Sequence, residues 1–102
     1  MPIGGEKYEF TQKNVDESPA SGGVYCFYAD NALIYYGSAP GGASTIRARL
    51  KSHFMGVEGG CTEAATHYKR EACNNPAERE KELLVEFRER HGRLPRCNAR
   101  KD

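Results

Sequence analysis

The sequence predicts a small α/β domain of the α+β type, in which a three-stranded, mostly antiparallel sheet is flanked by helices. Its centre is a β-hairpin between Gly23 and Gly37, where two runs of β-branched and aromatic residues are separated by Ala-Asp-Asn-Ala at positions 29–32. Asp and Asn tolerate left-handed backbone, so they favour a turn there. Two strands alone are only marginally stable, so other segments are expected to cover the hairpin.

Two helices are predicted, over residues 45–55 and 76–91, because apolar residues recur there every three to four positions. The apolar faces comprise Ile46, Leu50 and Phe54 in the first helix and Leu83, Leu84 and Phe87 in the second. Thr45 is a good N-cap, and Pro76 suits the first turn of a helix that a glycine then ends. Residues 67–73 predict the third strand.

The chain of 102 residues is long enough for one domain. We divide it into an N-terminal arm (1–20), a central domain (21–98) and a basic C-terminal tail (99–102). Residues 1–7 are expected to be frayed, and the chain from residue 93 onward is expected to be irregular.

The composition, 38% hydrophobic and 28% charged, is typical of a water-soluble globular protein. No apolar run approaches the roughly 20 residues of a membrane helix. The N-terminus lacks the apolar stretch and cleavage site of a signal peptide, so we expect a cytoplasmic location. The net charge is only +1, but basic residues cluster at 47–51 and 93–101.

The four cysteines form no Cys-x-x-Cys pair. In a cytoplasmic protein, free thiols are expected. Cys26 lies in a predicted strand and is expected to be buried. A zinc site built from Cys61, His67 and Cys73 is an alternative, although its spacing matches no standard pattern.

The two hairpin strands carry short motifs, Gly-Val-Tyr at 23–25 and Tyr-Tyr-Gly at 35–37. The polar landmarks that follow are Arg49, His53, Glu80, Pro95 and Asn98. From about residue 21 to 98, this order resembles the GIY-YIG nuclease family. Two departures stand out: Tyr36 is bulkier than the usual aliphatic residue, and Ser38 stands where many members carry lysine.

Two arginines compete for the position of the family's essential arginine. Arg49 is favoured over Arg47, because Leu50 follows it and His53 lies one helical turn further on, beside it on the same face. The family often carries Tyr or His at that spacing.

Three glutamates of the second helix compete for the family's metal-binding position. Glu80 is favoured because apolar residues follow it at the expected spacing, although its connection to Pro95 is long. Glu86 keeps the short spacing but puts charged residues where apolar ones belong, and Glu82 also stays open.

The resemblance implies a metal-dependent endonuclease that hydrolyses DNA phosphodiester bonds with Mg²⁺ or Mn²⁺. Glu80 would hold the metal, since hard cations need few protein ligands. Arg49 would hold the scissile phosphate with its planar charged fork. Tyr25 would act as the base, with its pKa lowered by the metal and the arginine, or would orient the attacking water.

Four further residues have roles that the resemblance implies. Tyr35 would help to shape the site, and His53 would hydrogen-bond phosphate or water. Gly37 would provide a turn that lets the backbone approach the site. Asn98 would position the first tyrosine, Tyr25.

An alternative function is that of a catalytically weak nucleic-acid-binding or scaffold module that depends on a partner. Members of the family often carry separate DNA-binding domains, so the expected partners are DNA and a protein that supplies DNA specificity, with no membrane. The basic tail from Arg93 to Lys101 is expected to contact the DNA backbone.

Overall fold

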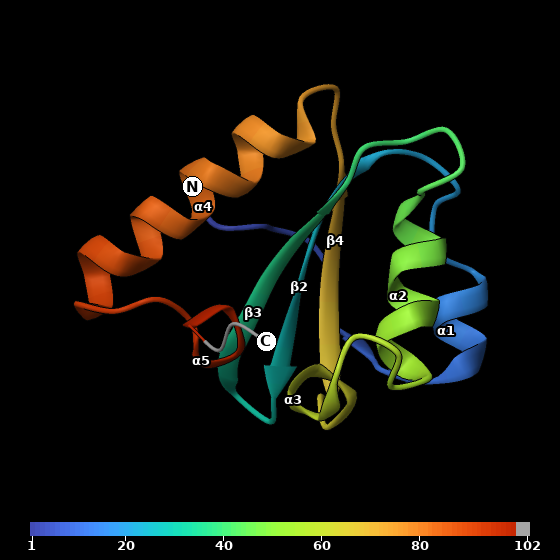
Figure 1. Cartoon of the computed structure of the whole chain (residues 1–102), viewed down its shortest axis with the longest axis horizontal. Coiled ribbons are helices and arrows are strands. Elements are labelled where there is room, and N and C mark those ends of the chain that lie inside the picture. Colours follow the sequence, from blue (N-terminus) through green and yellow to red (C-terminus); the bar gives the residue numbers. More distant parts are fainter. Residues whose placement is uncertain (100–102) are drawn as a thin grey trace.

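The computed structural model of the chain describes residues 1–99. Its strands are β1 (Tyr8–Glu9), β2 (Gly23–Ala29), β3 (Ala32–Ala39) and β4 (His67–Ala72). Its helices are α1 (Gln12–Asp16), α2 (Ile46–Phe54), α3 (Gly60–Glu63), α4 (Pro76–His91) and α5 (Arg96–Ala99). Helix α4 lies on one side of the sheet and α1 and α2 lie on the other (Figure 1). The predicted class, helices flanking a small sheet, is confirmed.

The sheet is antiparallel and has four strands, in the order β1-β4-β2-β3. The prediction of three strands was therefore wrong by one. The additional strand, β1, pairs with β4 through Tyr8 and Tyr68. Two residues are too few to show the alternation that identifies a strand in a sequence.

The hairpin forms as predicted, with β2 and β3 joined by Asp30 and Asn31. Asp30 has a φ of +57°, the left-handed conformation that aspartate tolerates. The register shifts between Phe27 and Tyr28, which leaves Ile34 without a partner on β2. This bulge sends Ile34 into the core on the α2 side.

Each face of the sheet has its own core. The core beneath α1 and α2 is built mainly of Phe10, Val15, Tyr25, Phe27, Ile34, Ile46, Leu50 and Tyr68. The core beneath α4 contains Ile3, Val24, Cys26, Tyr36, Leu83 and Phe87. Because strand side chains alternate between the two faces, Tyr25 of the first motif lies on the α2 side and Tyr36 lies on the α4 side.

The two long helices keep close to their predicted bounds. The Thr45 hydroxyl accepts a hydrogen bond from the Ala48 N–H at 3.1 Å and caps α2. Helix α4 spans the predicted residues, and Gly92 ends it with a φ of +73°.

Within residues 1–99, both terminal segments hold more structure than predicted. Ile3 is only 2% exposed, and the Met1 amino group lies 2.8 Å from a Glu86 carboxylate oxygen, so the expected fraying of residues 1–7 was wrong. The expected irregular segment after residue 93 contains α5, which a buried Pro95 precedes. Residues 100–102 of the predicted basic tail lie outside the described part of the chain.

Two of the four cysteines form a disulfide, Cys61–Cys97, so the expectation of free thiols was wrong for this pair. Helices α3 and α5 bring residues 36 positions apart to a Cα–Cα distance of 5.8 Å, which the spacing in sequence did not reveal. Cys26 is a buried free thiol as predicted, and Cys73 is also free. The suggested zinc site is wrong because the Cys61 sulfur is bonded to another sulfur.

In the described residues, no helix is both long and apolar enough to cross a membrane.

Candidate functional site

A buried hydrogen-bonded chain joins β2, α2 and α3. The Tyr25 hydroxyl lies 3.1 Å from His53 Nε2, and His53 Nδ1 lies 2.7 Å from the Thr62 hydroxyl. Tyr25, His53 and Thr62 are at most 4% exposed. Both ring nitrogens therefore have partners within the protein. His53 holds Tyr25 rather than presenting a free nitrogen to phosphate or water, which corrects the role expected for it.

Burial, together with the positive charge of Arg49, lowers the pKa of His53 to about 4. In the unfolded chain its pKa is near 6.5. As the pH falls below 6.5, the unfolded chain takes up this proton first, so stability is lost between pH 6.5 and pH 4. From pH 7 to pH 4.5, the free energy of unfolding should fall by about 2.5 kcal/mol through this group alone. Urea unfolding of wild type and His53→Gln measures this; an equal pH slope in both proteins would contradict it.

The residues around Tyr25 do not make it a base. Burial raises the pKa of its phenol well above the usual value; the neighbouring phenol of Tyr35 and the Glu80 carboxylate raise it further, while Arg49 lowers it. The expected lowering of its pKa is thus not a property of these residues alone. The phenol is suited to accept and donate hydrogen bonds, the water-orienting role that the sequence left open.

Gly37 lies inside β3 and not in a turn, which corrects the role expected for it. It faces Tyr25 across the β2–β3 ladder. A Cβ atom at residue 37 would lie 2.5 Å from Tyr25 Cζ and 2.6 Å from its hydroxyl oxygen. Glycine is needed here because the phenol ring packs directly over the backbone of β3.

Gly37→Ala is expected to destabilise the fold by about 1–3 kcal/mol, as overpacking does in well-packed cores. Tyr25 has little room to move, since its hydroxyl is held by His53. Gly4→Ala is the matched control, because a Cβ there meets nothing within 4 Å. Its effect should stay below about 0.5 kcal/mol in urea unfolding. Equal stability of the two variants would show that the Tyr25 ring moves without cost.

Arg49 adds a charged hydrogen-bond donor without an acceptor to the group formed by Tyr25, His53 and Thr62. Its Nε is buried and has no hydrogen-bond partner among the described residues. Its Nη1 lies 3.6 Å from a carboxylate oxygen of Glu58, in the connection from α2 to α3. Arg47, the competing arginine, instead donates from Nε to the Ser18 carbonyl at 2.8 Å. Of the two arginines, Arg49 is the one that adjoins the tyrosines.

Tyr35, on β3, lies beside Tyr25 and His53. Its ring centroid lies 6.3 Å from that of Tyr25 and 5.2 Å from that of His53. Burial raises the pKa of the Tyr35 hydroxyl, the negative charges of Glu80 and Glu58 raise it further, and Arg49 lowers it. Tyr35 thus lies within the electrostatic reach of Arg49 and of two carboxylates.

Glu80 is a partly exposed residue of α4, on the other side of the sheet from α2. Its charge raises the pKa of both Tyr35 and Tyr25. The competing glutamates are engaged elsewhere: Glu82 pairs with Arg79, and Glu86 pairs with the N-terminal amine. Among residues 1–99, no ion pair involves Glu80.

The donor set around Glu80 is compatible with a hard divalent cation. In the described residues, no three His, Cys, Asp or Glu side chains gather as a metal-binding group. A cation here would therefore use the partly exposed Glu80 carboxylate, with water and phosphate oxygens as its other ligands. Mg²⁺ and Mn²⁺ accept such oxygen-rich, water-rich coordination.

Asn98 was expected to position Tyr25, but its side-chain hydrogen bonds go to Tyr36. Its side-chain Oδ1 accepts from the Tyr36 N–H at 2.8 Å, and its Nδ2 donates to the Tyr36 carbonyl at 3.0 Å. The amide thereby pairs with the edge strand β3 as a neighbouring strand would. It fixes the backbone between Tyr35 and Gly37.

Two residues of this site were missed in the sequence. Thr62 lies nine positions from His53, and Glu58 lies in a loop, so neither shares a helix face with its partner. Neither belongs to a motif, and no local signal marks them.

No model of a known protein family and no curated protein matches this chain.

Proposed function

We propose that the chain is a metal-dependent endonuclease of the GIY-YIG type, which hydrolyses DNA phosphodiester bonds. The observation that carries this proposal is Arg49, whose buried Nε has no hydrogen-bond acceptor among residues 1–99 while its charge acts on Tyr25 and Tyr35. An arginine with an unused donor, close to two phenols that also sense a carboxylate, is suited to bind a phosphodiester.

In this proposal, the Arg49 guanidinium receives the scissile phosphate. The Glu58 carboxylate lies 3.6 Å from the guanidinium, and at this distance and exposure an ion pair is weak. A phosphate that offers two oxygens to the planar fork is a stronger partner than this single long contact. Binding of DNA thus exchanges the Glu58 carboxylate for phosphate oxygens.

The phenols of Tyr25 and Tyr35 orient the attacking water. Tyr25 stays protonated at neutral pH because burial raises its pKa, so it acts as a hydrogen-bonding group and does not remove the water's proton itself. His53 fixes the direction of the Tyr25 hydroxyl, and neutral imidazole does this without adding charge. Such fixed groups lower the barrier by holding the reactants in the attacking geometry.

Glu80 would hold the divalent cation. When bound, Mg²⁺ or Mn²⁺ supplies Lewis-acid stabilisation of the charge that develops on the phosphate. Glu80 is the one of the three competing α4 glutamates that raises the pKa of Tyr35 and Tyr25 by its charge, which supports this assignment.

The proposal is tested by incubating supercoiled plasmid and branched DNA with the protein in Mg²⁺, in Mn²⁺ and in EDTA. We expect nicked or cleaved product with either metal and none in EDTA. Binding in a salt series is measured in parallel. Salt-dependent binding with no cleavage on any of these DNAs would overturn the nuclease proposal in favour of a binding or partner-dependent module.

A further inference from the structure

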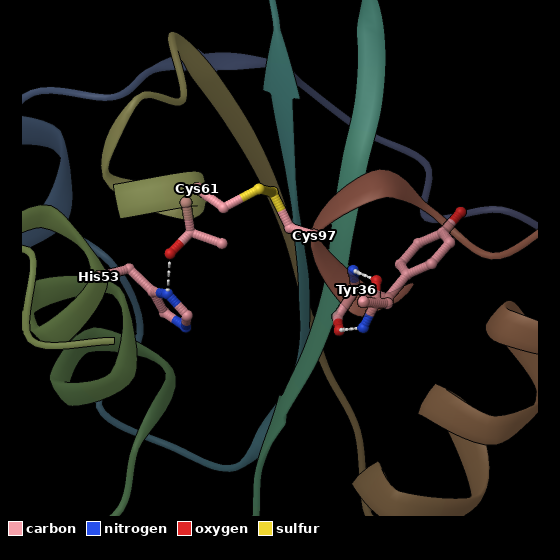
Figure 2. Close-up of a disulfide and its surroundings, with 6 residues drawn as sticks. Tyr36, His53, Cys61 and Cys97 are labelled. Carbon is pink, nitrogen blue, oxygen red and sulfur yellow. Dashed lines mark hydrogen bonds between the residues drawn. A yellow bond between two sulfur atoms is a disulfide. The ribbon is translucent and has the colours of Figure 1, made fainter. Parts of the chain in front are cut away.

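The disulfide lies between two of the contacts that hold the proposed nuclease site. Cys61 directly precedes Thr62, which hydrogen-bonds His53, and Cys97 directly precedes Asn98, which hydrogen-bonds the backbone of Tyr36 (Figure 2). The two cysteines are 36 positions apart in the sequence. The sulfur–sulfur bond therefore ties the segment that contains Thr62 to the segment that contains Asn98.

Neither segment that carries a cysteine can hold its position by helix formation alone. Helices α3 and α5 have four residues each, far fewer than a helix needs to persist by itself. The N-cap of α3 is Gly59, which makes no side-chain cap hydrogen bond. Apart from buried Thr62, the described residues of α3 are exposed or only partly buried. The disulfide is thus one restraint on α3, beside the hydrogen bond from Thr62 to His53.

The disulfide also borders the proposed site directly. One cavity of about 240 Å³ is lined by both cysteines together with Tyr35, His53 and Thr62. His53 is neutral at physiological pH, so one ring nitrogen carries a proton and donates a hydrogen bond, and the other nitrogen accepts a hydrogen bond. The Thr62 hydroxyl at Nδ1 decides how the ring is turned toward Tyr25 at Nε2. A shift of α3 would move the Thr62 hydroxyl away from His53, and neither the His53 ring nor the Tyr25 hydroxyl would then be held in its present orientation.

We propose that Thr62 is a positioning residue of the nuclease site and that the Cys61–Cys97 disulfide keeps it in place, so that reduction of the disulfide slows DNA cleavage. This inference rests on the proposed function. The inference adds a redox dependence to the proposed nuclease activity, and this dependence involves neither the metal nor contacts with DNA.

The chemical step is an ordinary thiol–disulfide exchange. A thiolate of a small dithiol attacks the sulfur of Cys61, which is the less buried of the pair. The Cys97 sulfur leaves and takes up a proton. The second thiol of the reagent then closes its own disulfide and releases Cys61 as a thiol. Two electrons and two protons pass to the protein, and the dithiol is oxidised.

The first test compares plasmid nicking in Mg²⁺ by wild type before and after treatment with dithiothreitol, at a temperature where circular dichroism shows both forms folded. We expect reduction to lower kcat at least tenfold, with little change in KM.

Cys73→Ser is the matched control, because it removes a partly exposed free thiol and keeps the disulfide. It should therefore respond to the dithiol as wild type does. Cys61→Ser/Cys97→Ser should be slow with or without the dithiol. Equal rates for folded oxidised and reduced wild type would overturn the inference.

The second test keeps the disulfide intact. Thr62→Val removes the hydroxyl with almost no change of shape and should lower kcat at least tenfold, while Thr62→Ser should recover most of the rate. Nitrogen chemical shifts of the His53 ring provide a readout that needs no activity. They should move both in Thr62→Val and on reduction of wild type. If oxidised wild type cuts no DNA, the proposed function fails, and unchanged ring shifts on reduction would overturn the coupling as well.

Discussion

Replacing Arg49 with alanine is expected to slow DNA nicking by about 10²–10³-fold, the loss that follows removal of one preorganised group that stabilises developing charge. The effect is large because the competing arginine of the same helix is engaged elsewhere. The nearest competitor along α2, Arg47, donates its Nε to the Ser18 carbonyl. The initial rate of nicked-circle formation at saturating protein measures the effect.

Arg47→Ala is the matched control, because it removes the same charge from the same helix. It should cost about 1 kcal/mol of stability through the lost hydrogen bond to Ser18, and leave the nicking rate of the folded protein within about twofold. A slow Arg47→Ala together with an unaffected Arg49→Ala would mean that Arg47 is the phosphate-binding arginine.

Glu80→Gln is expected to reduce metal-dependent nicking by two to three orders of magnitude, roughly the several kcal/mol that a bound cation contributes. Glutamine keeps the shape of the side chain and removes its charge, so the variant should fold normally. A second effect should appear without DNA. The pKa of Tyr35 should fall, because the Glu80 charge that raises it is gone. Ultraviolet titration of the phenols measures this.

Glu82→Gln and Glu86→Gln are the controls for this variant. Glu82 pairs with Arg79 and Glu86 with the N-terminal amine, so their loss should affect stability slightly and nicking little. If either control loses the metal-dependent rate while Glu80→Gln keeps it, the metal ligand is that glutamate instead.

The hairpin, β4, α2 and α4 could be predicted from the sequence because each is marked by local signals. The turn at Asp30, the cap at Thr45 and the stop at Gly92 all act within a few residues. β1, α3 and α5 show no such local signal, since they span two to four residues and depend on tertiary contacts. The disulfide between α3 and α5 depends on the same contacts.

The candidate site could be predicted as a set of residues but not as a set of contacts. The motifs singled out Tyr25 and Tyr35, and helical spacing put Arg49 beside His53. The partners of these groups come from loops and short helices. The hydrogen bond from His53 to Thr62 and the pairing of Asn98 with Tyr36 therefore had no signature in the sequence.

Gly37 shows the same limit in a single residue. Its place in the motif was visible, yet a strand glycine and a turn glycine look alike in a sequence. Only the Tyr25 ring, packed over it from β2, explains why no side chain is accepted there.

The most direct test of this account is to locate a paramagnetic cation on the protein, because it does not require the right DNA to be known. Mn²⁺ broadens the NMR signals of nearby nuclei even at fractional occupancy. We predict that substoichiometric Mn²⁺ broadens the amide signals around Glu80, Tyr35 and Tyr25 in wild type and leaves them sharp in Glu80→Gln. Broadening confined to other carboxylates, or unchanged in Glu80→Gln, would contradict a metal-dependent site at this position.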